Sequence, residues 1–439
     1  MTTYWAPHAL LPSGLATGVT FQITDGRFSA VTPNTNPLTA ERLSGIALPG
    51  FANCHSHAFH RALRGRTHHG GGTFWTWREG MYAVASRLDP DRYLDLARAT
   101  YAEMALAGIT AVGEFHYVHH QVDGTAYTDP NAMGEALRQA AADAGIRLTL
   151  LDTCYVAGGL GPDGHLDMSA EQRRFSDGDA DEWARRRREL RPDANTVIGA
   201  AIHSVRAVPR DQMRTVVAAT HGIPLHVHLS EQPAENEACR KHYGRTPTEL
   251  LSDVGALGRH TTAVHATHLT DHDIALLGGT RTTSCFCPTT ERDLADGIGP
   301  ARALLDAGSP LSLGSDQHAV IDLIEEARAL EMHERLDTLT RGRLSHDQLL
   351  AAATDHPSIG WSDAGLLEVG ARADLVVVQS DSPRTAGASP DQILYAAAAP
   401  DVHTVIRDGE VVVQDGRHRL GDVGQLLEQA IAPLWEGTA

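Results

Sequence analysis

Two histidines of this 439-residue chain, His55 and His57, are spaced so that they could hold a metal ion together. They directly follow an apolar segment, residues 46–54, that can form a strand. Alternate residues of a strand point to the same side, so both imidazoles could reach one ion. A chain with 25 histidines also produces such a pair by chance. The pair therefore predicts a metal site only if further ligands accompany it.

Further polar side chains follow other short apolar segments of the chain. They are His203 and Arg206, His228 and Glu231, His265, and Asp316. Three imidazoles and one carboxylate form a ligand set for a catalytic metal ion, here His55, His57, His228 and Asp316. We expect one divalent ion, zinc, although iron and manganese accept the same donors. His226 lies two residues before His228, and we expect it to pack in the interior.

The remaining residues of this set suggest hydrolytic chemistry. Glu231 lies three residues after His228 and could take a proton from an activated water and pass it to a leaving group. His265 could polarise a substrate, and Asp316 could accept a hydrogen bond from the water while contacting the metal. A buried His or Asp can also serve only to satisfy a backbone group. Five such residues at the ends of separate segments favour a shared site.

Strands and helices must alternate along the chain to bring these residues together. Apolar strand-like segments cover residues 108–113, 147–151, 196–202, 223–228, 262–265 and 310–315, and helical segments between them include residues 93–107 and 132–144. About eight such units predict a (β/α)8 barrel, whose mouth at the carboxyl ends of the strands would hold the polar residues. A doubly wound open sheet is the alternative, but the sequence has no Gly-x-Gly-x-x-Gly at a strand-to-helix turn.

Both ends of the chain look rich in strands. Asp25-Gly26 and Asp408-Gly409 are hairpin turn signals, and residues 374–378 form a compact apolar segment. We predict a small β-sandwich domain built from both termini, with the barrel inserted between its two parts. The expected boundaries are residues 1–48 and 366–439 for the small domain, the latter with a terminal helix, and residues 49–365 for the catalytic barrel.

Composition excludes several classes of partner. The formal charge of −18 argues against nucleic acid, which is bound by clustered Lys and Arg. No run of about 18 apolar residues and no signal-like N-terminus are found, so we expect a cytoplasmic protein that does not enter a membrane. The five scattered cysteines are expected to be reduced thiols. The run Arg185 to Arg188 is expected to form a solvated helix face, and His119 and His120 to lie in a loop or at the surface.

Several of these segments resemble the amidohydrolase superfamily over nearly the whole chain. They are Pro49-Gly50-Phe51-Ala52-Asn53-Cys54-His55-Ser56-His57, His228-Leu229-Ser230-Glu231, Val264-His265 and Gly314-Ser315-Asp316. Two-metal members of that superfamily commonly bridge their ions with a carboxylated lysine. The only lysine here, Lys241, lies past Glu231 rather than at the end of a middle strand. The resemblance therefore implies a single-metal, deaminase-type site, and it also suggests a homodimer.

A narrower resemblance is to the deiminases that act on N-formimidoyl-L-glutamate. It is carried by residues 57–62, 74–79, 113–117, 203–208 and 287–291. It implies that water attacks the formimidoyl carbon, releasing ammonia and N-formyl-L-glutamate in histidine degradation. It also implies a small dicarboxylate substrate whose contacts are His60, Arg78, Tyr117, His203 and Arg206, because planar guanidinium groups pair well with carboxylates. His60 stands where such deiminases often have Gln, and Gln317 where Ser is frequent.

Two other functions remain open from the sequence. A purine or adenosine-type deaminase of the same superfamily would need a pocket for a flat neutral ring, which leaves Arg78 and Arg206 hard to explain. A non-catalytic barrel that lost its metal is the alternative outside enzymes, and the complete ligand set together with Glu231 argues against it.

Overall fold

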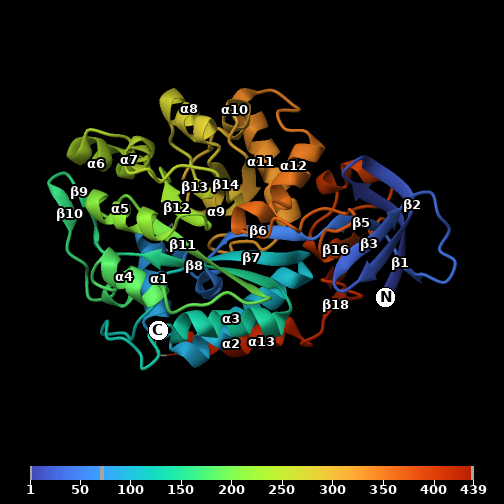
Figure 1. Ribbon diagram of the computed structural model, residues 1–439, viewed down its shortest axis with the longest axis horizontal. Coiled ribbons are helices and arrows are strands. Elements are labelled where there is room, and N and C mark those ends of the chain that lie inside the picture. Colours follow the sequence, from blue (N-terminus) through green and yellow to red (C-terminus); the bar gives the residue numbers. More distant parts are fainter. Residues whose placement is uncertain (1, 70–73, 437–439) are drawn as a thin grey trace.

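The chain folds into a parallel barrel with a smaller unit, built on a second sheet, attached to one side (Figure 1). The computed structural model describes residues 2–69 and 74–436. The side chains of Phe74 and Trp75, which belong to one segment of the narrower resemblance, lie outside the described part.

The barrel consists of eight parallel strands, hydrogen-bonded in the order β6-β7-β8-β11-β12-β13-β14-β15. Their bounds are β6 (Phe51–Ser56), β7 (Ile109–His116), β8 (Arg147–Cys154), β11 (Thr196–Ser204), β12 (Leu225–Leu229), β13 (Thr261–His265), β14 (Thr283–Phe286) and β15 (Leu311–Leu313). A parallel bridge between Ser56 and Asp316 closes the ring. The predicted barrel is therefore confirmed and the open doubly wound sheet is wrong. Strand β14, which has only four residues, was not among the predicted strands.

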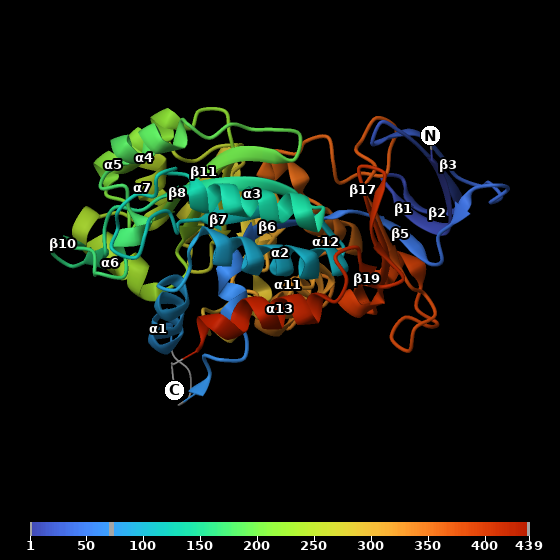
Figure 2. The same cartoon turned by 90° about the horizontal axis from the view of Figure 1, so that it is seen from below.

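Helices follow the strands and cover the outside of the barrel (Figures 1 and 2). They are α1 (Phe74–Ala85), α2 (Pro90–Leu106), α3 (Ala132–Ala144), α4 (Ala180–Arg187), α5 (Arg210–Ala219), α6 (Pro233–Tyr243), α7 (Pro247–Asp253), α8 (Asp271–Thr280), α9 (Pro288–Asp293), α10 (Ala301–Ala307), α11 (Leu323–Thr338) and α12 (His346–Ala353). Asp89 caps α2 by accepting from the backbone N–H of Arg92, and left-handed Gly145 ends α3. Both helices match the predicted segments, because their start and stop signals are local.

The small sheet combines strands from both ends of the chain. It contains β1 (Thr2–Leu11), β2 (Gly14–Thr24), β3 (Arg27–Thr32), β4 (Glu41–Arg42), β5 (Ile46–Pro49), β16 (Leu375–Val378), β17 (Val402–Arg407), β18 (Glu410–Gln414) and β19 (Arg417–His418). The two ends meet where β5 pairs with β1 on one side and with β16 on the other. Both predicted hairpin turns are present, with positive φ at Asp25-Gly26 (50° and 74°) and at Asp408-Gly409 (49° and 80°).

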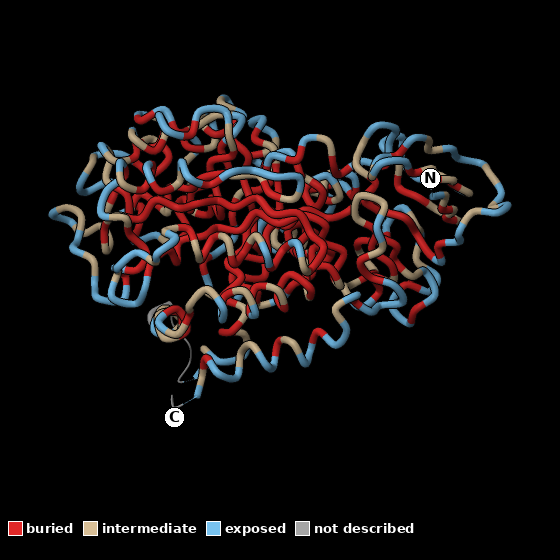
Figure 3. Tube along the Cα trace, turned by 60° about the horizontal axis from the view of Figure 1, so that its bottom comes forward, coloured by how far each residue is buried: buried red, intermediate tan, exposed pale blue. Residues whose placement is uncertain are grey.

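One buried core fills the barrel and extends to the small sheet, and a second core lies within the small sheet; buried segments are red in Figure 3. The barrel strands β7 and β8 are buried along their whole length, as expected for parallel strands covered by helices. The final helix, α13 (Val423–Ile431), leaves the small sheet and packs beside α2 of the barrel (Figure 2). No helix in the described residues is long and apolar enough to span a bilayer.

A buried ion pair joins the two sheets. Arg147, the first residue of β8, is fully buried, and its guanidinium donates to Asp374 Oδ1 at 3.2 Å and to Asp408 Oδ1 at 3.1 Å. Thr110 Oγ1, in β7, also donates to Asp374 at 3.2 Å. Burial raises the pKa of Asp374, but the neighbouring Arg147 outweighs it and leaves that pKa below its usual value. The barrel thus supplies the cation and the small sheet the anions.

The prediction of a solvated face for Arg185 to Arg188 was wrong at Arg186, and His119 and His120 lie in a loop, as predicted, but are buried. Arg186 is only 6% exposed and binds Asp152 and Asp177 through paired hydrogen bonds. His119 and His120 are buried in the same cluster, where His120 contacts Asp177 at 3.0 Å. Helix α4 turns this one arginine toward the acid on β8, so a run of arginines that looks uniformly solvated contains a buried member.

We predict that Arg147→Met lowers the free energy of unfolding by about 3–5 kcal/mol, because it leaves Asp374 buried without its cation. Denaturant unfolding would measure the loss. Arg98→Met is the control, since Arg98 pairs with Asp95 and Asp143 at the surface and should cost less than about 1 kcal/mol. Equal losses in the two variants would contradict the role given to Arg147.

Candidate active site

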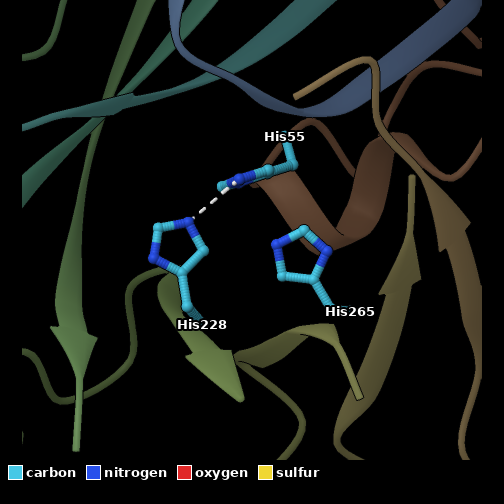
Figure 4. Close-up of side chains that lie close together, drawn as sticks. All are labelled: His55, His228 and His265. Atoms are coloured by element: carbon cyan, nitrogen blue, oxygen red, sulfur yellow. Dashed lines mark hydrogen bonds between the residues drawn. The ribbon is translucent and has the colours of Figure 1, made fainter. Parts of the chain in front are cut away.

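Histidines from several strands converge at the carboxyl end of the barrel. Figure 4 shows His55, His228 and His265 pointing toward one another from β6, β12 and β13. His57 and Asp316 join them just beyond the ends of β6 and β15. Three residues at the strand exits of this mouth, Ser230, His265 and Asp316, have positive φ of 51°, 69° and 41°. Such strained conformations gather at functional sites, where the surrounding structure enforces them.

Four of the distances between the donor atoms of His55, His57, His228 and Asp316 are close to those between ligands of one metal ion. His228 Nε2 lies 3.2 Å from His55 Nε2 and 3.4 Å from His57 Nε2. Asp316 Oδ1 lies 3.3 Å from His55 Nε2 and 3.4 Å from His57 Nε2. Ligands on a tetrahedral zinc ion with bonds of roughly 2.0–2.1 Å are about 3.3–3.4 Å apart. The cluster therefore fits a single divalent metal ion.

Hydrogen bonds and burial also give the histidine rings the tautomer and the charge that metal binding requires. His57 donates from Nδ1 to the carbonyl oxygen of Phe115, and His228 from Nδ1 to that of His203, both at 2.9 Å. These bonds leave the Nε2 lone pairs directed at the cluster. Burial lowers the pKa of His55 to about 3 and that of His57 to about 4. Both imidazoles are therefore neutral near pH 7 and can bind a cation.

His265 differs from the other histidines because three carboxylates surround it. Its Nε2 lies 3.8 Å from both Glu231 Oε1 and Asp316 Oδ2, and its Nδ1 lies 3.5 Å from Glu291 Oε1. Burial alone lowers the pKa of His265, but Glu231, Glu291 and Asp316 together raise it well above its ordinary value. The three carboxylates around His265 thus favour its protonated form.

One pocket opens over this cluster. All the predicted site residues except His55 line it, while His55 is fully buried beneath. The predicted substrate contacts form its wall, listed here as His60, Arg78, Tyr117, His203 and Arg206. His60 Nε2 lies 3.0 Å from the hydroxyl of Tyr117, and Arg78 donates from Nε to the hydroxyl of Tyr82 at 2.7 Å. The pocket therefore combines a metal-binding floor with two guanidinium groups on its wall.

Several residues of the site were not predicted. They are Glu235, Glu291, Cys287 and Tyr155. Cys287 lies with His265 and Asp316 in a group whose donor atoms are within 4.8 Å of one another. Cys287 and Glu291 lie in the segment 287–291 that carries the narrower resemblance, but no role in the site was predicted for either of them from the sequence. His226 packs in the interior as predicted, close to the carbonyl oxygen of Ser358.

Two other features bear on the number of metal ions. Lys241 is exposed on α6, away from the cluster, so it does not bridge ions there. A second group of possible ligands, His116, His119 and Asp152, lies between β7 and β8 and the helices outside them. There Arg186 donates to both carboxylate oxygens of Asp152, at 2.8 and 3.0 Å. That acid is already neutralised by a cation.

The chain is similar to known proteins over nearly its whole length. It is 39% identical to formimidoylglutamate deiminase of Pseudomonas aeruginosa, with 95% of this chain and 96% of that protein covered. It is 29% identical to 5-methylthioadenosine/S-adenosylhomocysteine deaminase of Pelotomaculum thermopropionicum, with 84% and 81% covered. Among solved structures, an amidohydrolase from Brucella melitensis superposes with a TM-score of 0.91 at 33% identity, covering 99% and 100% of the two chains.

A family model matches most of the chain as well. It is described as the amidohydrolase family and spans residues 46–412, from β5 of the small sheet through the barrel to β18. The match thus covers the barrel and the junction between the two sheets. The chain belongs to the amidohydrolase family.

Proposed function

We propose that this protein hydrolyses N-formimidoyl-L-glutamate to N-formyl-L-glutamate and ammonia. The observation that carries the proposal is the pocket itself, which places Arg78 and Arg206 on its wall above a metal-binding floor. Two guanidinium groups suit a substrate with two carboxylates, since each can hold one by paired hydrogen bonds. The deiminase from Pseudomonas aeruginosa, at 39% identity, supports the same substrate.

His55, His57, His228 and Asp316 would hold one divalent ion, and we propose zinc. Four of the distances between their donor atoms are close to those expected around one zinc ion, and neutral imidazoles with one carboxylate are ligands that zinc accepts. When bound, the ion supplies Lewis acidity that makes a water molecule nucleophilic at neutral pH.

Glu231 is proposed to move the protons of the reaction. Its carboxylate faces His265 at the floor of the pocket and lies beside the guanidinium of Arg206. As the water oxygen bonds to the formimidoyl carbon, Glu231 takes a proton from it and delivers that proton to the terminal nitrogen. The second proton of the water then passes through Glu231 to the same nitrogen, so the carbon–nitrogen bond breaks, the formyl carbonyl forms, and ammonia departs.

His265 and Asp316 are proposed to assist at the attacking oxygen. Asp316 can accept a hydrogen bond from the water, and the positively charged His265 can stabilise negative charge that develops on the oxygen. His60, Tyr117 and His203 would add single hydrogen bonds to the substrate. A homodimer and a cytoplasmic location, suggested at the level of sequence, stay predictions.

The direct test is ammonia and formylglutamate production from formimidoylglutamate by purified, metal-assayed protein. The second candidate is a deaminase acting on a purine nucleoside, which the similarity to the methylthioadenosine deaminase favours. We expect turnover of formimidoylglutamate and none of adenosine, methylthioadenosine or guanine. Activity only on the bases would overturn the proposal.

We predict that His228→Ala retains little zinc after dialysis, whereas the wild type retains one ion per chain, because the variant loses one of four converging donors. Elemental analysis would measure the content. His226→Gln is the matched control on the same strand, two residues away, and should keep the metal. Full zinc content in the folded His228→Ala variant would remove His228 from the ligand set.

We predict that Glu231→Gln keeps its metal but loses about 10²–10⁴-fold in kcat, since the amide cannot carry the proton. Steady-state ammonia release and zinc analysis on one preparation would separate the two effects. Glu237→Gln, an exposed acid on α6, is the control and should behave as wild type. Near-normal kcat in Glu231→Gln would assign the proton transfer to another group.

A further inference from the structure

Glu235 is a buried acid that contacts two functional segments at once. It lies in the first turn of α6 and is 2% exposed. Its Oε2 accepts a hydrogen bond from Arg206 Nε at 2.8 Å, and its Oε1 accepts one from the backbone N–H of Ser230 at 3.1 Å. One carboxylate therefore ties the segment after β11 to the segment after β12.

The contact with Arg206 determines which part of that side chain faces the pocket. Glu235 occupies the Nε edge of the guanidinium, so the Nη groups are the part that can meet a substrate carboxylate. Arg206 Nη2 also lies 3.6 Å from Glu231 Oε2, which is too long for a hydrogen bond. Arg206 is thus hydrogen-bonded to Glu235 but not to Glu231.

The contact with Ser230 supports the turn that carries Glu231. Ser230 stands between His228 and Glu231 and has a φ of 51°, in the left-handed region that a residue with a side chain rarely adopts. A hydrogen bond from its N–H to a buried carboxylate stabilises that turn.

We propose that Glu235 is a positioning residue, which orients Arg206 toward one carboxylate of the substrate and keeps it from forming a hydrogen bond with Glu231. This inference rests on the proposed function. Without the charge on Glu235, the nearest acid to Arg206 is Glu231, and opposite charges in a buried site attract strongly. Arg206 would then be drawn from the substrate to the proton carrier.

Glu235→Gln is the variant that tests this proposal. The amide has one acceptor oxygen, so it cannot serve both Arg206 and Ser230, and it carries no charge. We expect KM for formimidoylglutamate to rise at least about tenfold, as expected for a lost charge-assisted contact, with zinc content unchanged. Glu235→Asp keeps the charge and should recover part of the loss. Glu237→Gln, exposed on the same helix, is the control.

Two substrates with a single carboxylate distinguish positioning from general damage. N-formimidoylglycine keeps only the α-carboxylate, and 4-formimidoylaminobutyrate keeps only the one at the far end. If Glu235 acts through Arg206, Glu235→Gln lowers kcat/KM for the analogue whose carboxylate Arg206 binds and leaves the other within about twofold of wild type. Equal losses on both analogues, or no loss on either, would overturn the proposal.

Binding of the product provides a readout independent of turnover. Calorimetry should show N-formylglutamate binding to the wild type and binding at least about tenfold weaker to Glu235→Gln. A wild type that neither turns over formimidoylglutamate nor binds formylglutamate would reject the proposed function, and this inference with it. A wild type that does both, with a variant that matches it, would reject the positioning role alone.

Discussion

The site depends on how the barrel closes between its first and last strands. Strand β15 has only three residues, so the closing contacts lie beyond its end. His57 donates its backbone N–H to Asp316 at 3.1 Å, and Asp316 donates its own to His55 at 3.0 Å. These backbone bonds join three of the four proposed metal ligands. Closure of the ring therefore brings His55, His57 and Asp316 together.

A network of buried polar side chains next to this closure fixes the position of β6 against β15. Asn53 and Ser315 exchange two hydrogen bonds, at 2.7 and 2.9 Å, across the joint between β6 and β15. Ser56 donates to Glu114 at 2.7 Å, and Glu114 also accepts from the backbone N–H of Ala58. Because unpaired polar groups are costly in the interior, a shift of one strand against the other would break several of these bonds together.

Neighbouring groups, more than the net charge of −18, determine the charge of each side chain in the pocket. Burial lowers the pKa of His55 and His57, the proposed metal ligands, whereas the surrounding acids raise the pKa of His265. A hydrogen bond to Glu235 holds Arg206 in its position beside Glu231. An acidic protein can therefore present local cations to an anionic substrate.

The sequence by itself determined the alternation of strands and helices, both hairpin turns, and the residues placed at the strand ends. These follow from periodicity, capping and turn chemistry, which act over a few residues. Strand β14 was missed because four residues carry too little pattern. Only the tertiary structure decided that Arg186 is buried, that His265 lies among acids, and that Glu235 pairs with Arg206. Those outcomes depend on segments distant in the chain meeting in a low-dielectric interior, where each partner sets the charge and orientation of the other.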